Sequence, residues 1–420
     1  MKTYSYILFL FLSFSAFSQE VLTLEECYNL AEKNYPLARQ IELLEDKSRN
    51  QIGIISKGRL PQLDINAQAS YQSEVIQFPL ELPNITIDPP NKDQYRVSLD
   101  ANQLIYYGGS IEANTKLKEA ELKSQQQKVA VNLYALRSRI NQSYFSVLLF
   151  QEQIKLQTSK MEELEVRLKE IDSGVKYGAI LPSAKQSLQA EKLKLEQQLS
   201  ESNFNRKKAI ESLSALIAQN LDSNTVLERM PANITLDAEA ERPEMKLFEL
   251  QEKQLVSSQD VLSKTKYPRL MGFAQFGYGN PGLNMLDNSF QDFYMVGLKI
   301  KWNILDWGKV KEQKQIIDIS KNILATEKET FILNNSIQLQ DAQSDINKFE
   351  EILQKDEEII HLREQVLDAA TSQFQNGVIP SSEYITELNN LYEAKIAQEL
   401  HQTQLSLAKA NFNLIKGNRK

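Results

Sequence analysis

The chain has 420 residues, with 55 acidic and 48 basic side chains, a net charge of −7 and only two histidines. The acidic balance argues against nucleic acid as a partner, because duplex binding depends on clustered lysine and arginine. No apolar run of about 18 residues follows the N-terminus, and the mean hydropathy is −0.41, so a helical membrane span is not expected in the mature chain.

Residues 1–18 have the features of an export signal. Lys2 supplies a positive charge, and residues 7–12 are continuously apolar. Ala16 and Ser18 place small side chains at positions −3 and −1 of a cleavage site before Gln19. The apolar run is too short for a comfortable membrane anchor, so we predict a cleaved signal peptide over 1–18.

Two helices and two strands are predicted at the start of the mature chain. A helix over 24–34 gives way to another over 36–57, which begins with proline, a residue suited to the first helical turn. Pro61 lies just past the end of the second helix. Apolar and polar side chains then alternate over 63–72 and 95–102, which predicts two strands joined by a long loop.

A very long helical hairpin follows these strands. Gly108 ends the second strand, and residues 110–173 contain neither proline nor glycine. At about 1.5 Å per residue a helix of that length would extend roughly 95 Å, too far to fold against one small core. It is predicted to turn at Tyr177, Gly178 and Ala179, where glycine suits the left-handed end of a helix.

The same order of elements returns about 200 residues later, and the step from Pro36 to Pro243 equals the step from Pro61 to Pro268. The second copy contains strands near 270–279 and 293–303, a strand-to-helix junction at Gly308, a helix over 310–375 and a corner at Asn376, Gly377 and Val378. We therefore predict a tandem duplication, with one copy over 19–225 and the other over 226–420.

The second long helix carries apolar pairs every seven residues, at 352/353, 359/360 and 366/367. A seven-residue repeat predicts coiled-coil packing against neighbouring helices. An ordinary soluble coiled coil would explain these helices, but it would not explain the strands.

The strands resemble those of outer-membrane proteins in length and composition. Each alternates over about ten residues with aromatic side chains near its ends, although Met271 and Phe273 weaken the alternation near 270–279. A soluble sheet is the alternative, but the flanking helices are too long and too polar to cover an apolar face. The loops 73–94 and 280–292 lie away from the helices, so we expect them to face the cell exterior and the helices to lie in the periplasm.

Strand counting predicts an oligomer. Four strands cannot close a transmembrane barrel, because an open edge leaves backbone groups unpaired in lipid and the smallest bacterial barrels have about eight strands. Two, three or four chains would give about 8, 12 or 16 strands. The count requires a shared barrel and does not choose among these numbers.

The order of these motifs resembles that of the TolC-like outer-membrane factor family. Residues 22–27 (Leu-Thr-Leu-Glu-Glu-Cys) and 31–36 (Ala-Glu-Lys-Asn-Tyr-Pro) are similar to the family's first helix and the break after it. Residues 103–109 (Gln-Leu-Ile-Tyr-Tyr-Gly-Gly) are similar to its strand-to-helix junction. The likeness covers essentially the whole mature chain, and its specificity lies in the order of the motifs.

The resemblance implies a mainly α-helical fold with a small transmembrane β part. It implies a homotrimer in outer-membrane lipid, with a shared barrel of about 12 strands continued by a periplasmic tube of about 12 helices. It also implies a passive channel in a tripartite efflux pump or a type I secretion system, gated at the periplasmic corners. The partners implied are a periplasmic adaptor (membrane fusion) protein and an inner-membrane RND, ABC or MFS transporter.

The resemblance also assigns roles to particular positions. The corners at 177–179 and 376–378 correspond to the family's adaptor-docking tips, although a helix end alone would explain the glycines. Glu383 matches one acid of a ring that narrows the periplasmic mouth. Thr386 stands where a second such acid is expected, and the neighbouring Glu387 is the candidate substitute. A solvated glutamate in the first turn of a helix is the simpler interpretation of Glu383.

No catalytic, cofactor or metal site is predicted. His361 and His401 are far apart in the sequence, and no phosphate-binding loop or nucleophile motif is present. Cys27 is the single cysteine, and Glu26 before it is unsuited to lipoprotein cleavage, so we interpret Cys27 as a small apolar residue on a helix. The rival to a channel is a soluble periplasmic coiled-coil scaffold or adaptor. Adaptors carry one helical hairpin, whereas two are predicted here.

Overall fold

The computed structural model describes residues 21–76, 89–178, 180–223, 225–229 and 242–417. The predicted signal peptide and Ala179 lie outside these ranges, as does much of the loop predicted over 73–94. The chain divides into two compact units. The hairpin unit comprises residues 1–39, 130–243 and 331–420, and the sheet unit comprises residues 40–129 and 244–330.

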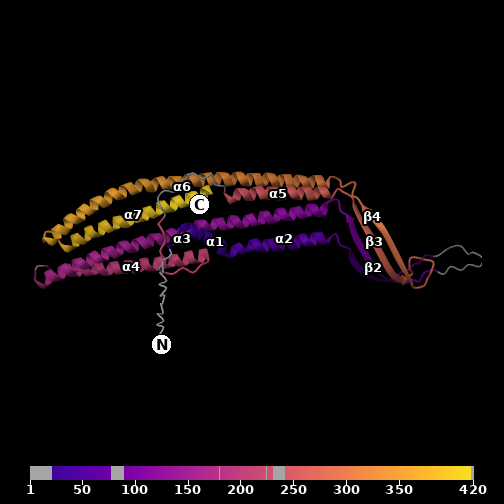
Figure 1. Cartoon of the computed structure of the whole chain (residues 1–420), viewed down its shortest axis with the longest axis horizontal. Coiled ribbons are helices and arrows are strands. Elements are labelled where there is room, and N and C mark those ends of the chain that lie inside the picture. Colours follow the sequence, from indigo (N-terminus) through magenta and orange to yellow (C-terminus); the bar gives the residue numbers. More distant parts are fainter. Residues whose placement is uncertain (1–20, 77–88, 179, 224, 230–241, 418–420) are drawn as a thin grey trace, which may run out of the picture. The chain divides into compact units, whose positions relative to one another are not determined.

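The elements follow the order of a repeated motif (Figure 1). They are α1 (Leu24–Asn34), a 3₁₀ turn (Pro36–Arg39), α2 (Gln40–Lys57), β1 (Gln62–Tyr71), β2 (Asp93–Tyr106), α3 (Ser110–Lys176), α4 (Pro182–Ile217), α5 (Pro243–Lys264), β3 (Arg269–Asn280), β4 (Gln291–Lys301), α6 (Lys309–Gln375) and α7 (Ser381–Lys416). A strand occupies each range in which the sequence alternates. The helix predicted from Pro36 begins as the 3₁₀ turn, and β2 continues past residue 102 through a register shift between Leu104 and Tyr106.

The sheet unit contains one antiparallel sheet in the order β1-β2-β3-β4. Its register aligns apolar side chains in rows across one face, and one such row consists of Ile65, Leu99, Phe276 and Tyr294. These four side chains are 77%, 43%, 55% and 70% exposed, so nothing in the described chain covers this face. The outer edges of β1 and β4 have no strand partner among the described residues.

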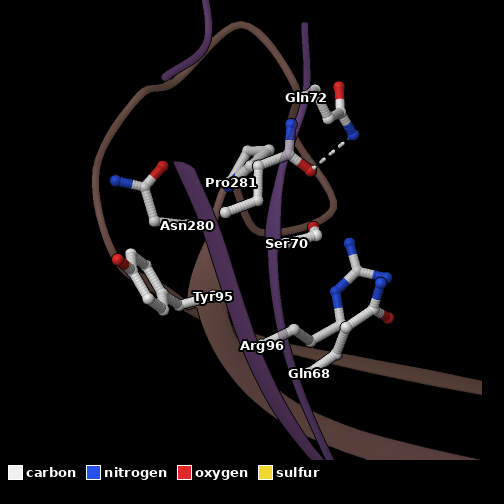
Figure 2. Close-up of a pocket in the computed structure, with 8 residues that line it drawn as sticks. Gln68, Ser70, Gln72, Tyr95, Arg96, Asn280 and Pro281 are labelled. Carbon is white, nitrogen blue, oxygen red and sulfur yellow. Dashed lines mark hydrogen bonds between the residues drawn. The ribbon is translucent and has the colours of Figure 1, made fainter. Parts of the chain in front are cut away.

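The opposite face of the sheet is polar. The Asp100 carboxylate accepts hydrogen bonds from the side-chain amides of Asn66 (2.5 Å) and Gln275 (2.6 Å). Nearer the loops, this face presents glutamine side chains, and the Gln72 amide donates to Gln94 (3.3 Å) beside a cavity of about 110 Å³ (Figure 2). Arg96 is the charged side chain in the lining of this cavity.

Two phenylalanines interrupt the polar face for a packing reason. A side chain at Gly297 would place its Cβ 2.8 Å from the Phe273 ring, and one at Gly277 would meet the Phe293 ring. Each ring therefore fills the space left by a glycine on the neighbouring strand. This packing explains why the alternation weakens at Phe273 in the sequence.

Two helical hairpins dominate the hairpin unit (Figure 1). Ion pairs join α3 to α4, including Lys192 to Glu165 at 2.8 Å, and join α6 to α7, including Lys395 to Glu364 at 2.9 Å. In two of the three predicted apolar pairs of α6 the second residue is the more buried: Leu367 is buried and Val366 exposed, and Ile360 is half-buried and Ile359 exposed. In the remaining pair, Ile352 and Leu353 are both half-buried. None of the helices in the described chain combines the length and hydropathy of a membrane-crossing helix.

The N-terminal segment is fastened to the hairpin unit at several points. Thr23 caps α1 through a capping box with Glu26, and Cys27 is fully buried, as a small apolar helix residue should be. Burial raises the pKa of the Cys27 thiol to about 12. The Tyr144 hydroxyl donates to the carbonyls of Leu22 (3.1 Å) and Glu228 (2.6 Å), next to a bridge between Leu22 and residue 227.

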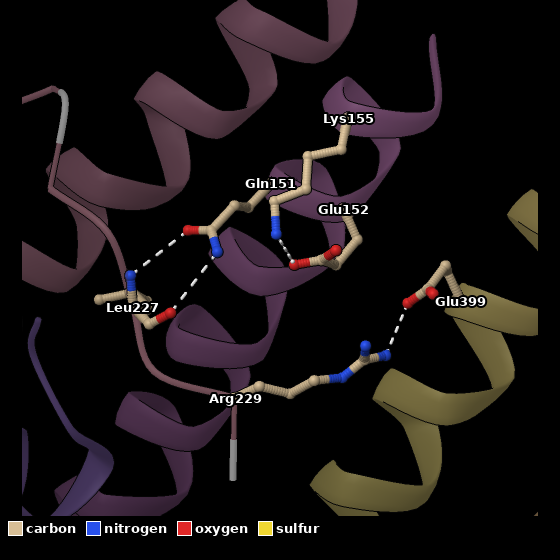
Figure 3. A network of polar contacts seen from close by, with 6 residues as sticks. All are labelled: Gln151, Glu152, Lys155, Leu227, Arg229 and Glu399. Atoms are coloured by element: carbon tan, nitrogen blue, oxygen red, sulfur yellow. Dashed lines mark hydrogen bonds and ion pairs between the residues drawn. The ribbon is translucent and has the colours of Figure 1, made fainter. Parts of the chain in front are cut away.

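The segment that precedes the second copy is also anchored (Figure 3). The Gln151 side chain of α3 accepts a hydrogen bond from the Leu227 amide (3.3 Å) and donates to the Leu227 carbonyl (3.5 Å). Arg229 pairs with Glu399 of α7 at 2.6 Å. Residues 225–229 therefore tie the first hairpin to the second.

Candidate functional site

The corner between α3 and α4 is built around two glycines. Gly178 has a φ of 76°, and its amide donates to the Val175 carbonyl. Gly174 makes room for Ile180, because a Cβ there would lie 2.5 Å from the Ile180 side chain. Tyr177 is 81% exposed at the turn. Ala179 lies outside the described residues.

The corner between α6 and α7 ends in a Schellman motif. The Gly377 amide donates to the Phe374 carbonyl (3.0 Å), and the Val378 amide donates to the Gln373 carbonyl (2.8 Å). Gly377 has a φ of 75°, and nothing lies within 4 Å of a Cβ built on it. The Asn376 side chain donates to the Ser372 carbonyl (2.8 Å). Each corner glycine therefore adopts the left-handed conformation that ends its helix, and the space where a side chain would lie is open.

Replacing Gly377 by alanine tests this backbone requirement. The site has room for a methyl group, so the change adds left-handed strain alone, about 1 kcal/mol. We expect hydrogen exchange at the Val378 amide to become about fivefold faster. Gly53→Ala is the matched control, because Gly53 lies inside α2 with nothing within 4 Å and alanine should stabilise that helix. Equal exchange in Gly377→Ala and the unmodified protein would contradict the prediction.

The two candidate mouth carboxylates lie in different environments. Glu383 is exposed in the first turn of α7, and its carboxylate makes no hydrogen bond or ion pair within the described chain. Glu387 is half-buried, pairs with Arg363 of α6 at 3.3 Å and accepts from the Asn390 amide. Glu383 is thus available to a partner outside this chain, whereas Glu387 joins α6 to α7.

A polar cluster, which the sequence did not reveal, connects the two hairpins. Glu163 of α3 accepts hydrogen bonds from the hydroxyls of Tyr384 (3.2 Å) and Tyr392 (3.4 Å) of α7. Lys160, one turn earlier, donates to Asn389 of α7 (2.5 Å) and pairs with Glu191 of α4 (3.2 Å). We call Lys160, Glu163, Tyr384, Asn389 and Tyr392 the hairpin link.

The hairpin link lies on one apolar core. That core consists of Leu164, Ile171, Leu188 and Leu195 from the first hairpin and Leu367, Tyr384, Leu388, Leu391 and Tyr392 from the second. Ile180 and Ile379, from the two corners, pack against it. The corners therefore belong to a single packed assembly. The spacing of Tyr384, Leu388 and Leu391 along α7 is the sequence signal that could have indicated this face.

The strand-to-helix junctions lie in the sheet unit. Pro61 and Pro268 occupy the short connections that lead into β1 and β3. Gly108 has a φ of 60°, and a Cβ there would lie 2.5 Å from the Tyr267 Cβ, so both backbone and space require glycine. Gly308 has a φ of 82° in open space.

The structure corrects the alignment of these junctions by one residue. The sequence pairs Gly108 with Gly308, but the two left-handed residues before α3 are Gly108 and Gly109, and those before α6 are Trp307 and Gly308. Trp307 therefore adopts the left-handed conformation that the first copy gives to glycine, with a φ of 53° and a side chain that is 86% exposed. A bulky residue there stores strain, which commonly marks a functional position.

Trp307→Gly should raise the thermal unfolding midpoint of the protein in detergent. The indole makes little contact within the chain, and glycine relieves about 1 kcal/mol of backbone strain. Trp307→Ala removes the same indole but keeps the backbone strain, so comparing the two variants separates loss of the indole from relief of strain. A lower midpoint for Trp307→Gly would show instead that the indole is buried against another molecule.

In the described chain no group of three or more histidine, cysteine, aspartate or glutamate side chains could hold a metal. His361 contacts Gln365 (3.1 Å), and His401 contacts Asp356 (2.7 Å).

The comparisons with known proteins agree with this architecture. The family model described as outer membrane efflux protein matches residues 27–219 and again residues 236–418, which fits the predicted duplication. The fold is similar to that of the outer membrane channel CmeC of Campylobacter jejuni, with 15% identity, a TM-score of 0.66, and coverage of 94% of this chain and 85% of that one. It is also similar to the outer membrane protein VceC of Vibrio cholerae, with 14% identity, a TM-score of 0.66, and coverage of 94% and 97%. No curated protein sequence matches the chain.

Proposed function

Because this chain belongs to the outer membrane efflux protein family, we propose that three copies form one passive duct that carries solutes from the periplasm to the exterior. The protein is an outer-membrane efflux channel with a large periplasmic helical part, and it is a conduit rather than an enzyme. The finer features proposed are the trimer, docking to a periplasmic adaptor, gating at the corners and the identity of the pump.

The sheet carries this proposal. Its four strands leave the edges of β1 and β4 unpaired within the described chain, and its apolar face is uncovered. In lipid such edges must pair, and pairing β4 of one copy with β1 of the next would close a ring. Three copies would give a barrel of about 12 strands, within the range of outer-membrane barrels.

A row of side chains on α6 supports assembly through the helices. Ile316, Ile319 and Ile323 are 62%, 58% and 54% exposed, and Thr326 and Thr330 continue the row at spacings of three and four residues. This row, the α6 seam, has the pattern of a coiled-coil contact. Because it has no partner in the described chain, a neighbouring copy is its expected cover.

The corners support adaptor docking. Tyr177 and Val378 are exposed by 81% and 71%, and Gly178 and Gly377 leave open space beside them. Small residues at an exposed corner allow another helix to approach closely. We therefore propose that the corners at 177–179 and 376–378 bind a periplasmic adaptor, which couples the duct to an inner-membrane RND, ABC or MFS transporter.

Gating would require the two hairpins to separate at the hairpin link. In a trimer, three exposed Glu383 carboxylates could narrow the mouth and attract cations. The pairing of Glu387 with Arg363 favours Glu383 as the residue of this ring. A type I secretion system would use the same duct with a different pump.

The test is the mass and location of the mature protein. It is extracted from the outer-membrane fraction in mild detergent, and its protein mass is measured by light scattering. About three chain masses in the membrane fraction is the expected result. A monomer in the soluble periplasm would reject the channel and favour the rival scaffold or adaptor.

A further inference from the structure

A cavity of about 430 Å³ lies within the sheet unit, where α5 ends, β3 begins and α6 starts. Its lining includes four cations, Lys266, Arg269, Lys301 and Lys309, and one acid, Asp306. We call it the basic cavity. All of its lining belongs to a single chain.

Asp306, the one acid in the lining of the basic cavity, is already hydrogen-bonded to backbone amides. The Asp306 carboxylate accepts hydrogen bonds from the amides of Gly308 (3.1 Å) and Val310 (3.3 Å) and so caps the start of α6. These backbone hydrogen bonds lower the pKa of Asp306, so the carboxylate stays ionised in this role. One negative charge faces four positive charges, which leaves an excess of positive charge.

Acids in the described part of the chain do not neutralise these cations one for one, although Lys266 contributes to the lowered pKa of Asp306. None of the four forms an ion pair within the residues that the structure describes. Arg269 lies over the Tyr107 ring, with its guanidinium carbon 4.3 Å from the centroid. The strand register places Arg269 directly opposite Lys301, and like charges in that position are destabilising. Lys301 is exposed and Arg269 half-buried, so water screens part of this repulsion, and a bound anion would relieve the rest.

The basic cavity lies on the polar side of the sheet. Arg269 and Lys301 alternate with Leu270 and Ile300, whose side chains belong to the apolar face. In the channel of the proposed function, on which this step rests, the polar side faces the lumen. A ligand there is a solute in transit rather than a membrane lipid.

The lining also has an apolar part, which includes Leu262, Tyr267 and Val310. A site that combines cations with apolar side chains suits a molecule that has an anionic group and an apolar body. We propose that the basic cavity binds an amphipathic organic anion, with a sulfonate, carboxylate or phosphate group on an apolar body, and that it forms a cargo subsite at the junction of strands and helices.

The experiment uses 2-naphthalenesulfonate as the probe and uncharged 2-naphthol as its control. Binding is measured by titration calorimetry on the full-length mature protein in a nonionic detergent, with empty micelles as the blank. Arg269→Gln combined with Lys301→Gln should weaken sulfonate binding at least about tenfold. The matched control is Lys47→Gln combined with Lys57→Gln, which removes two exposed cations from α2 and should leave affinity unchanged.

A second variant, Lys266→Gln with Lys309→Gln, keeps the strands unaltered and should weaken binding in the same way. Equal affinity in the unmodified protein and both cavity variants would overturn the proposal, as would equal binding of 2-naphthol. The site is complete in one chain, so its test is independent of assembly. If the protein is monomeric but binds the sulfonate, the proposed anion site stands and the proposed channel is rejected. If the protein is a trimer but binds no sulfonate, only the proposed anion site is rejected.

Discussion

Ile319→Asp combined with Ile323→Asp is expected to abolish the proposed trimer while leaving the single chain folded. Both side chains are more than half exposed, so the changes remove little packing within the chain. In an assembled coiled-coil contact, however, they would place two charges in an apolar seam, where unpaired charges are strongly unfavourable. Light scattering in detergent should shift from about three chain masses to one, with an unchanged circular dichroism spectrum.

The control for this prediction adds the same two charges elsewhere on α6. Asn322→Asp with Ala325→Asp falls at exposed positions outside the α6 seam, and the trimer should persist. Loss of the trimer in both variants would mean that added negative charge, rather than the seam, decides assembly. A trimer that survives the seam variant would place the contact on another surface.

A closed ring of identical chains also needs a second, different surface to meet the α6 seam. In the sheet unit α6 contacts α5, where Lys321 donates to Gln259 (2.9 Å), and α2 contacts α3, where Gln126 donates to Glu45 (2.8 Å). α2 exposes Leu43 and Ile54 by 65% and 70%. The edge formed by α2 and β1 is therefore the expected partner of the edge formed by α6 and β4.

The sequence predicted the repeated elements well because each carries a strong local signal. Period-two alternation located the strands, and the absence of proline and glycine located α3 and α6. The corners were predictable because Gly178 and Gly377 supply the left-handed conformation that ends a helix. These features depend on residues close together in the sequence.

The features that the sequence did not predict depend on residues far apart in it. Glu163 meets Tyr384 and Tyr392 only after two hairpins have packed, and nothing in the local pattern distinguishes it from other helix-surface glutamates. The one-residue error at the junctions has a similar origin. Trp307 matches Tyr107 in aromatic character, but its backbone takes the place of Gly108. The sequence alignment matched residues of similar side-chain type, whereas the backbone conformations match Trp307 with Gly108.

The hairpin link leads to the second large effect, on the opening of the channel. Tyr384→Phe with Tyr392→Phe should raise the open probability of the channel. The variants keep both rings, including the stacking of Tyr384 on Phe374 with centroids 5.2 Å apart, and remove the two hydroxyls that donate to Glu163. Each lost hydrogen bond between the hairpins contributes about 1 kcal/mol, so the open-to-closed ratio should rise roughly 30-fold. Single-channel recording in planar bilayers measures this ratio.

Tyr177→Phe is the matched control for the hairpin link. It removes a hydroxyl from a tyrosine of the same unit that is 81% exposed and makes no hydrogen bond through that hydroxyl within the described chain, so open probability should not change. The open probability of Glu163→Gln should lie between those of the tyrosine pair and Tyr177→Phe. The glutamine amide oxygen can still accept a hydrogen bond from one hydroxyl, but the carboxylate charge that strengthens both hydrogen bonds is lost. If all three variants conduct alike, the hairpins separate elsewhere. If the tyrosine pair conducts most, Glu163→Gln conducts less than the pair and Tyr177→Phe is unchanged, the hydrogen bonds to Glu163 hold the mouth closed. An adaptor that docks at the corners could then open the duct by pulling α7 away from α3. If the tyrosine pair conducts more and Glu163→Gln does not, the Tyr384 hydroxyl acts through Arg167 of α3 instead.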